Sequence, residues 1–443
     1  MFAQIKYRRR PSDLDWNPLC QKYQENGLSV SSLSCILDGA VHLASPSPLQ
    51  PGHKAERLEL GNGISALIYH TIKDVPRSVW DAHIRFHSEA TSWAFWNVLE
   101  QSGLNDFVYH YALLVNQTGQ VLAQTCFYDV TTDLAIFGPR WLRRSLAAVR
   151  RIWPGFMKLR MLECGTPITL VSPPVAILPH TDSSLTITAL TTLLRKVAQR
   201  QKQLLIVIRD FEPPAAPLEP IFATHGYHLS DNLPNTYLEI SWPTWHDYLQ
   251  SMRSYYRSKL VKYLNRNAKL GITSELTSDF ADLAETLHAQ WMNVHQHAKE
   301  FQREVLTPLF YRTLAQQDGI DARVLLFYRQ GALVGHALLL QDHEELRWLY
   351  VGREAICPDG LYLFIAQKVV ETAISLGVKR LEMGLTTYPV KQDLGAEIVP
   401  LRMALRATNS FLNLFVGLGY KVLNHVSIPH ARQVFKQRNG HEP

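Results

Sequence analysis

The order of the predicted secondary-structure elements most constrains the fold of this chain, because the same order occurs twice. In each half, two apolar runs joined by a short turn predict a β-hairpin, and a strand, a loop, an amphipathic helix and a second strand follow. The hairpin covers 109–128 in the first half and 322–340 in the second, and the long helices cover 185–201 and 361–376. Residue identities do not repeat with the elements. The repeated order predicts an α/β fold of two tandem domains, each a mixed sheet flanked by helices.

The length of the chain agrees with this division. A chain of 443 residues exceeds one ordinary core and indicates more than one domain. Residues 1–55 are irregular and end in a stretch rich in Pro, so we expect an N-terminal arm or linker there. The expected domains cover 56–242 and 272–443, the second with a C-terminal extension. A basic linker helix is expected at 243–271.

A polar stretch in the second half is the clearest candidate site. The apolar strand expected at 378–383 runs directly into a Gly, two hydroxyls, the phenol of Tyr388 and the amine of Lys391. Open α/β sheets bind ligands beyond the carboxyl ends of their strands, so polar groups gathered at this point indicate a site. The alternative is a polar turn whose hydroxyls cap backbone groups.

The segment between the two expected domains is basic and aromatic. Its cations alternate with tyrosines, and its apolar positions recur at helical spacing over 246–270. Such a helix can bind phosphates, and the alternative is the solvated charged face of a linker helix packed between domains. The candidate nucleic-acid-binding residues are Arg253, Arg257, Lys259 and Lys262. The formal net charge of +6 fits an anionic ligand, a nucleic acid or a membrane surface.

Cysteine and histidine usage narrows the range of function classes. The five cysteines are scattered and form no CxxC pair, so we expect a reducing, cytoplasmic compartment. His288 and His295 stand two helical turns apart, and no Cys or carboxylate completes a ligand set with them and His297, so no metal site is expected. No apolar run approaches the roughly 18 residues of a membrane-spanning helix.

The succession of hairpin, strand, loop, helix and strand resembles the core of the GNAT acyltransferase family. The stretch Ala-Leu-Val-Gly-His-Ala-Leu at 332–338 looks like the second and third strands of that family. In the first half, 222–227 resembles the family's late helix, which ends in Gly followed by an aromatic residue. The resemblance covers about residues 56–408 as two tandem domains.

Two further stretches resemble a narrower branch of that family. The basic run at 255–260 and the polar run at 384–391 are similar to tandem GNAT proteins that include the Fem peptidoglycan aminoacyltransferases. The resemblance implies an acyltransferase that forms an amide on an amine acceptor. Its donor would be an acyl-CoA or acyl-carrier-protein thioester, with no permanently bound cofactor. Two alternatives stay open: a Fem-type enzyme with aminoacyl-tRNA as donor, which the basic helix would suit, and a non-catalytic GNAT-fold binding protein.

The donor-binding loop departs from the pattern of the acetyl-CoA branch. In that branch an Arg or Gln, a Gly and a small residue at fixed spacing present backbone N–H groups to the pyrophosphate at a helix N-terminus. The corresponding stretch here begins at Arg353, has Ile356 at the Gly position, and has Pro358, which has no N–H to donate. The resemblance implies Arg353, Asp359 and Gly360 as the donor-binding residues.

Acyl transfer to an amine needs a base for the ammonium proton and stabilisation of the tetrahedral oxyanion. The phenol of Tyr388 or of Tyr350 could protonate the leaving group or lie beside the oxyanion, and Lys391 could stabilise the negative oxygen.

Two further residues are candidate bases. His336 lies on an expected central strand, and the alternative is a structural histidine with its hydrogen bonds satisfied. Glu382 faces away from its apolar strand neighbours and is either a base or only the partner of Arg380 or Arg347.

Overall fold

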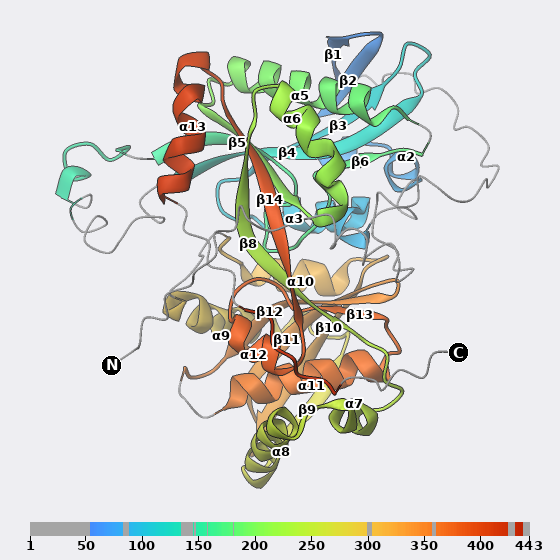
Figure 1. Ribbon diagram of the computed structural model, residues 1–443, viewed down its shortest axis with the longest axis vertical. Helices are drawn as coiled ribbons and strands as arrows, with labels where there is room; N and C mark the ends of the chain where they lie inside the picture. The colour runs from blue at the N-terminus through green and yellow to red at the C-terminus, as the bar shows by residue number, and fades with distance from the viewer. Residues whose placement is uncertain are drawn as a thin grey trace.

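The computed structural model describes residues 54–82, 88–133, 145, 148–156, 158–179, 181–298, 304–356, 360–423 and 430–436. Two α/β halves lie one above the other and share one 14-stranded sheet (Figure 1). The predicted fold class is therefore confirmed. The expected N-terminal arm lies almost wholly outside the described residues, and the domain boundaries stay a prediction.

The first half of the sheet follows the predicted series. Its strands, in spatial order, are β1 (Glu56–Gly61), β2 (Ile64–Tyr69), β3 (Val108–Val115), β4 (Val121–Asp133), β5 (Lys158–Cys164) and β7 (Leu205–Phe211). All neighbours are antiparallel except β5 and β7, which are parallel. The short strand β6 (Val175–Ile177) pairs with β4 beyond the end of β5.

The second half repeats this pattern. Its strands are β9 (Ile272–Thr277), β10 (Asp321–Arg329), β11 (Ala332–Asp342), β12 (Glu345–Arg353) and β13 (Arg380–Glu382). The only parallel pair in this series is β12 with β13, which corresponds to β5 with β7 in the first half.

The two halves exchange their last strands. The last strand of the first half, β8 (His228–Glu239), pairs with β13 of the second half. The place beside β7 is taken by β14 (Glu397–Ala407), which comes from the end of the second half and also pairs with β8. Each half is thus completed by a strand of the other, so the two sheets are continuous.

The long predicted helices are present and pack on the sheet. In α5 (Ser183–Arg200), the side chain of Asp182 accepts hydrogen bonds from the backbone N–H groups of Ser184 and Leu185. This helix and α6 (Glu219–Thr224) bury one apolar cluster against the first half. A second cluster joins the halves, because α3 (Trp93–Gln101) packs with α9 (Ala284–His297) and α10 (Pro308–Gln316).

The expected single linker helix is two helices. The first, α7 (Trp245–Ser251), ends at Met252, and α8 (Ser254–Lys269) begins after Arg253. Both intervening residues are extended, and the N–H of Arg253 donates to the carbonyl of Val434, a bond that a continuous helix would not allow. Helix α8 packs on α11 (Leu361–Ser375) with its charged residues outward.

Among the described residues, none of the helices combines the length and the apolarity that crossing a membrane requires.

Candidate active site at the divergence of two parallel strands

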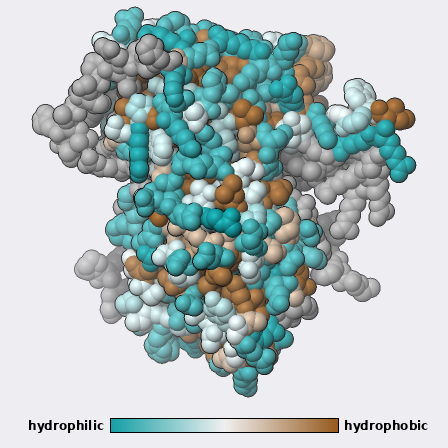
Figure 2. Space-filling view, turned by 180° about the vertical axis from the view of Figure 1, so that it is seen from behind, coloured by the Kyte–Doolittle hydropathy of each residue, from teal (hydrophilic) through white to brown (hydrophobic). Residues whose placement is uncertain are grey.

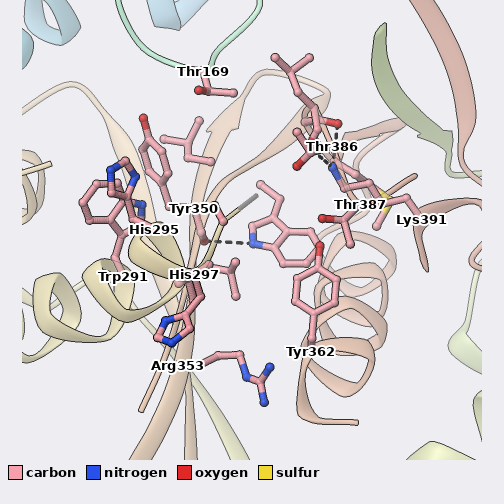
Figure 3. A pocket seen from close by; sticks show the side chains of 18 of the residues that line it. Thr169, Trp291, His295, His297, Tyr350, Arg353, Tyr362, Thr386, Thr387 and Lys391 are labelled. Carbon is pink, nitrogen blue, oxygen red and sulfur yellow. Dashed lines mark hydrogen bonds between the residues drawn. The ribbon is translucent and has the colours of Figure 1, made fainter. Parts of the chain in front are cut away.

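A cavity opens where β12 and β13 stop pairing. Their parallel pairing joins 345–347 with 380–382 only, after which the two strands separate. The other edge of β12 carries a β-bulge, because Leu338 faces Tyr350 while Leu339 faces Trp348, leaving Leu349 as the extra residue. A bulge bends its strand and re-aims the side chains beside it. The cavity between the separating strands has a volume of about 390 Å³ (Figure 3).

The walls of the cavity come from both halves of the chain. Trp291, His295 and His297 of α9 form one wall, and the loop 384–387 with Lys391 forms the opposite one (Figure 3). The bulged part of β12 lies between them. Thr169 closes one end from the first half, and Arg353 and Tyr362 lie toward the other end. Of the described residues that line the cavity, Thr169 alone comes from the first half.

Glu304 is a cavity residue that the sequence did not reveal. Its side chain is buried, with 4% of the residue exposed. One oxygen, Oε1, accepts from the hydroxyl of Tyr350 at 2.8 Å and from the backbone N–H of Thr169 at 2.9 Å. The other oxygen, Oε2, has no hydrogen-bond partner among the described residues. A buried carboxylate oxygen with unused acceptor capacity is suited to accept a proton from a ligand.

The first half of the chain holds this carboxylate in place. The loop after β5 reaches across to the second half, where Thr169 donates to Glu304 and the carbonyl of Val171 accepts from Arg347 at 3.0 Å. Burial and the charge of Glu304 raise the pKa of the Tyr350 phenol, so this hydroxyl keeps its proton and stays a donor. The orientation of Glu304 therefore depends on both halves.

Lys391 is buried in the opposite wall. It lies on α12 (Tyr388–Asp393), and its Nζ donates to the carbonyls of Gly384 at 2.8 Å and Leu385 at 2.7 Å. Burial lowers the pKa of Lys391 to about 7, and the charge of Glu382 opposes this shift. A neutral amine has two N–H groups, enough for both carbonyls. The protonated form has a third N–H to offer.

The loop held by Lys391 has an unusual backbone. Thr386 and Thr387 are both left-handed, with φ of 63° and 51°. This conformation is costly for a β-branched residue and persists only where the surroundings enforce it. The two lysine hydrogen bonds to the preceding carbonyls provide that constraint. Both threonines line the cavity, so the polar stretch forms part of a cavity wall and is more than a solvent-exposed turn.

Three predicted catalytic residues do not line the cavity. The hydroxyl of Tyr388 donates to the carbonyl of Pro234 at 3.0 Å. Glu382 forms an ion pair with Arg347, the alternative considered above, and also accepts from the side-chain amide of Asn235 at 2.7 Å. Both of its carboxylate oxygens are therefore occupied.

His336 is fully buried on β11, where its ring contacts α9 and α10. Its Nδ1 lies 3.0 Å from the Gln290 side-chain oxygen, and its Nε2 lies 3.3 Å from the hydroxyl of Tyr311. Burial lowers the pKa of His336 to about 3, so the imidazole is neutral. These contacts are those of a structural histidine whose hydrogen bonds are satisfied.

The predicted donor-binding residues lie near the start of α11, as far as they are described. Arg353 is mostly buried and lines the cavity. Gly360 is the N-cap of α11 with φ of 83°, and a Cβ there would lie 2.6 Å from the Tyr263 ring. Asp359 lies outside the described residues. A helix N-terminus beside an arginine favours an anionic group, and Tyr362 of its first turn lines the cavity.

Three of the four predicted nucleic-acid-binding residues bond to other side chains of this chain. Lys259 pairs with Asp393, Arg253 donates to Gln433, and Arg257 donates to Gln250. Lys262 is exposed.

Comparison with known proteins identifies the class to which this cavity belongs. Residues 250–392 match the acetyltransferase (GNAT) domain family. The match contains the separating strands, both walls and Lys391, and it covers about a third of the chain.

Relatives of known name or structure extend the likeness over most of the chain. A protein of Mycobacterium tuberculosis strains CDC 1551 / Oshkosh and H37Rv, named as a candidate 8-amino-7-oxononanoate synthase 2, is 28% identical over 323 residues. That match covers 70% of this chain and 41% of that protein, so the chain spans less than half the length of these relatives. The crystal structure of FemX is 13% identical, with a TM-score of 0.51 over 77% of this chain and 98% of FemX. A tandem GNAT protein from the clavulanic acid biosynthesis pathway is 10% identical, covers 68% of this chain and 84% of that protein, and has a TM-score of 0.40.

The FemX match establishes a shared fold over most of the chain. This chain is therefore a GNAT-fold protein related in architecture to FemX, as the order of its elements predicts.

Proposed function

We propose that this protein is an acyltransferase that forms an amide on an amine acceptor from the thioester of coenzyme A or of a carrier protein. The observation that carries the proposal is the cavity between the separating strands of the GNAT domain, with the buried carboxylate of Glu304 at its wall. The chemistry needs a base in a site that excludes water, and a carboxylate whose Oε2 has no partner in the described part of the chain supplies that base.

The donor and the acceptor would enter from different ends of the cavity. Arg353 and the N-terminus of α11 offer positive charge to the anionic part of the donor. Thr169, whose N–H holds Glu304, lies at the opposite end (Figure 3). The bulged part of β12 lies between these ends, where the thioester carbonyl would meet the amine.

The reaction proceeds in balanced steps. Glu304 Oε2 takes a proton from the acceptor ammonium, and the freed nitrogen attacks the thioester carbonyl carbon. A C–N bond forms, the carbonyl oxygen becomes an oxyanion, and the C–S bond breaks as the oxyanion collapses. The leaving thiolate takes up the proton that the attached nitrogen still has to lose, and Glu304 then gives its own proton to solvent. Protonated Lys391 has a third N–H that can stabilise the oxyanion, while its other two hold the loop 384–387.

The proposal assigns no catalytic role to Tyr388, Glu382 or His336. Their polar atoms bond to Pro234, to Arg347 and Asn235, and to Gln290 and Tyr311. We assign these residues to the support of the cavity walls.

Release of free thiol tests the proposal. The full chain is incubated with a panel of acyl-CoA thioesters of increasing chain length and a panel of primary amines. The free thiol is titrated with a chromogenic disulfide, and the amide is identified by mass spectrometry. We expect amine-dependent thiol release that Glu304→Gln abolishes. If no thioester yields an amide with any amine, the same assay is run with acyl-carrier-protein donors. Failure there as well refutes the thioester reaction and leaves the aminoacyl-tRNA enzyme and the binding protein.

The exposed cations of α8 favour aminoacyl-tRNA as a second candidate donor. Lys262, Arg266 and Lys269 are exposed on the second part of this helix. If they bind RNA, Lys262→Glu with Arg266→Glu should weaken binding. The slope of log affinity against log salt concentration should also become shallower, by the equivalent of about one to two phosphate contacts. Binding of tRNA is measured by filter retention between 50 and 300 mM salt. A wild-type chain without salt-dependent RNA binding excludes this donor.

A further inference from the structure

The helix α13 (Ser410–Leu423) presents an unusual number of large apolar side chains to solvent. Single exposed leucines are common on protein surfaces, but several on one short helix indicate an interaction surface. The exposed residues are Phe411 at 67%, Leu412 at 48%, Leu414 at 72%, Phe415 at 55% and Leu418 at 66%. No charged residue occurs between positions 410 and 419.

Several contacts fix the orientation of this helix. The side chain of Asn413 accepts from the N–H of Ala407 at 2.8 Å and donates to the carbonyl of Gly226 at 2.9 Å. The ring of His228 lies 2.7 Å from the backbone carbonyl of Asn413. Val416 packs inward on a small apolar cluster of the sheet. The exposed side chains are therefore held outward by the way the helix is anchored.

A second apolar segment projects between β4 and β5. In Ala148–Phe156, the exposed apolar residues are Ile152 at 91%, Trp153 at 63% and Val149 at 41%. Arg150 and Arg151 lie among them. The sequence from 134 to 157 holds five arginines and neither Asp nor Glu. This segment thus combines apolar bulk, a tryptophan and positive charge without any compensating acid.

Helix α13 and the start of β5, which directly follows the projecting segment, pack on the same apolar cluster of the sheet. Leu159, which begins β5 just after the projecting segment, packs against the same small cluster as Val416 of α13. Both elements lie on one side of the upper half in Figure 1, and the projecting segment carries hydrophobic and hydrophilic residues side by side in Figure 2. Lys158 and Arg160 are exposed beside Leu159 and add two cations.

We propose that α13 and Ala148–Phe156 together form a surface that binds the interface of an anionic lipid bilayer. Exposed leucine, isoleucine and phenylalanine side chains insert at the boundary between headgroups and acyl chains. Trp153 suits the same boundary, and arginines beside it attract acidic headgroups.

The charge of this surface favours a bilayer over a second copy of the chain. A two-fold pairing of the surface with itself would bring its cations against one another, since no acid lies in 148–160. An RNA ligand would use the cations but would leave the apolar side chains of α13 in water. The binding mode proposed is peripheral and does not depend on the reaction proposed for the cavity.

Vesicle cosedimentation of the full chain tests the proposal. The vesicles are pure phosphatidylcholine, or phosphatidylcholine with about a third phosphatidylglycerol. We expect binding to the anionic vesicles only. Leu414→Glu and Ile152→Glu should each weaken it at least tenfold, because each replaces an inserting side chain with a charge that acidic lipids repel. Replacing Arg150 and Arg151 with glutamine should weaken binding about fivefold per residue and reduce its salt dependence.

A matched control separates this surface from exposed apolar residues in general. Leu309 on α10 is 45% exposed and lies in the other half, so Leu309→Glu should leave vesicle binding unchanged. Thermal unfolding checks that each variant stays folded.

Three results overturn the proposal. They are no binding of the wild type to anionic vesicles, equal loss of binding with Leu309→Glu, and a dimer in light scattering that Leu414→Glu dissociates. The last result would assign the surface to a second copy of the chain.

Discussion

Replacing Glu304 with glutamine isolates the charge of this side chain from its shape. Oε1 accepts both hydrogen bonds of the carboxylate, one from Tyr350 and one from Thr169. A glutamine carbonyl can keep both. The amide NH₂ then takes the place of Oε2, the oxygen without a partner among the described residues. The variant should therefore keep the geometry of the cavity and lose only the ability to accept a proton.

The size of the two effects can be estimated separately. Loss of a positioned general base typically lowers the rate about 10²- to 10⁴-fold. This corresponds to about 2.7–5.4 kcal/mol of transition-state stabilisation. A buried amide N–H left without an acceptor costs about 1–3 kcal/mol of folding stability at most. A domain of ordinary stability tolerates that loss, so Glu304→Gln should fold and be nearly inactive.

The assay is the rate of thiol release, with the thioester and the amine concentrations varied in turn. We expect kcat to fall at least 100-fold while the KM for the thioester changes little, because Arg353 and Thr169 lie toward opposite ends of the cavity (Figure 3). Tyr350→Phe removes one of the two hydrogen bonds to Glu304 and should cause a smaller loss.

An exposed carboxylate provides the matched control. Glu371 on α11 pairs only with Lys368 near the surface, so Glu371→Gln should have wild-type activity. A Glu304→Gln enzyme within about threefold of the wild-type rate at neutral pH would refute the assignment of the base. The proton would then pass to solvent or to another group.

Three further predictions concern the fold around this site. Because burial lowers the pKa of Lys391 from 10.5 to about 7, the unfolded chain binds more protons between these pH values, and this residue's contribution to stability rises with pH across that window. The free energy of unfolding of the wild type, measured in urea, should therefore rise relative to that of Lys391→Met between pH 7 and pH 10. A difference that stays constant over this range would contradict the shifted pKa. Gly360→Ala should destabilise the chain by about 1–3 kcal/mol more than Gly61→Ala. Both glycines have positive φ, but only at Gly360 would a Cβ meet the Tyr263 ring, so equal losses in melting temperature would show that the ring yields freely. Residues 54–242 expressed alone should show no cooperative unfolding, because this fragment lacks β14, which pairs with β7 in the full chain. The full chain should unfold in one calorimetric transition. A fragment that folds would show that the exchanged strand is dispensable.

Local patterns predicted the individual elements well. The hairpin turns, the Asp182 cap of α5 and the apolar periodicity of α11 each depend on residues close together in sequence. The break between α7 and α8 was missed because its cause, the bond from Arg253 to Val434, comes from a residue far along the chain.

The polar stretch at 384–391 shows which features of the site follow from the local sequence and which do not. Its position after a short apolar strand predicted a candidate site, and residues 384–387 with Lys391 line a cavity. The same reasoning could not tell that the hydroxyl of Tyr388 faces Pro234, 154 residues earlier. Side-chain direction in a loop with two left-handed threonines does not follow the alternation of a strand.

Glu304 could not be predicted as a site residue from the sequence. It follows no motif, and its partners Tyr350 and Thr169 lie 46 and 135 residues away. Nothing in its neighbourhood along the chain distinguishes it from a surface glutamate. Only the packing of both halves buries the side chain and leaves one oxygen unused.

The sequence by itself determined the α/β class and the repeated order of elements, because periodicity, turns and caps are short-range properties of the chain. The tertiary structure alone decided that β8 and β14 exchange halves, that β12 and β13 separate to open the cavity, and that the first half supplies the N–H which holds Glu304. Strand partners are chosen by hydrogen bonds and apolar contacts between segments up to about 200 positions apart, and a local pattern carries no information about which distant edge a strand will complete.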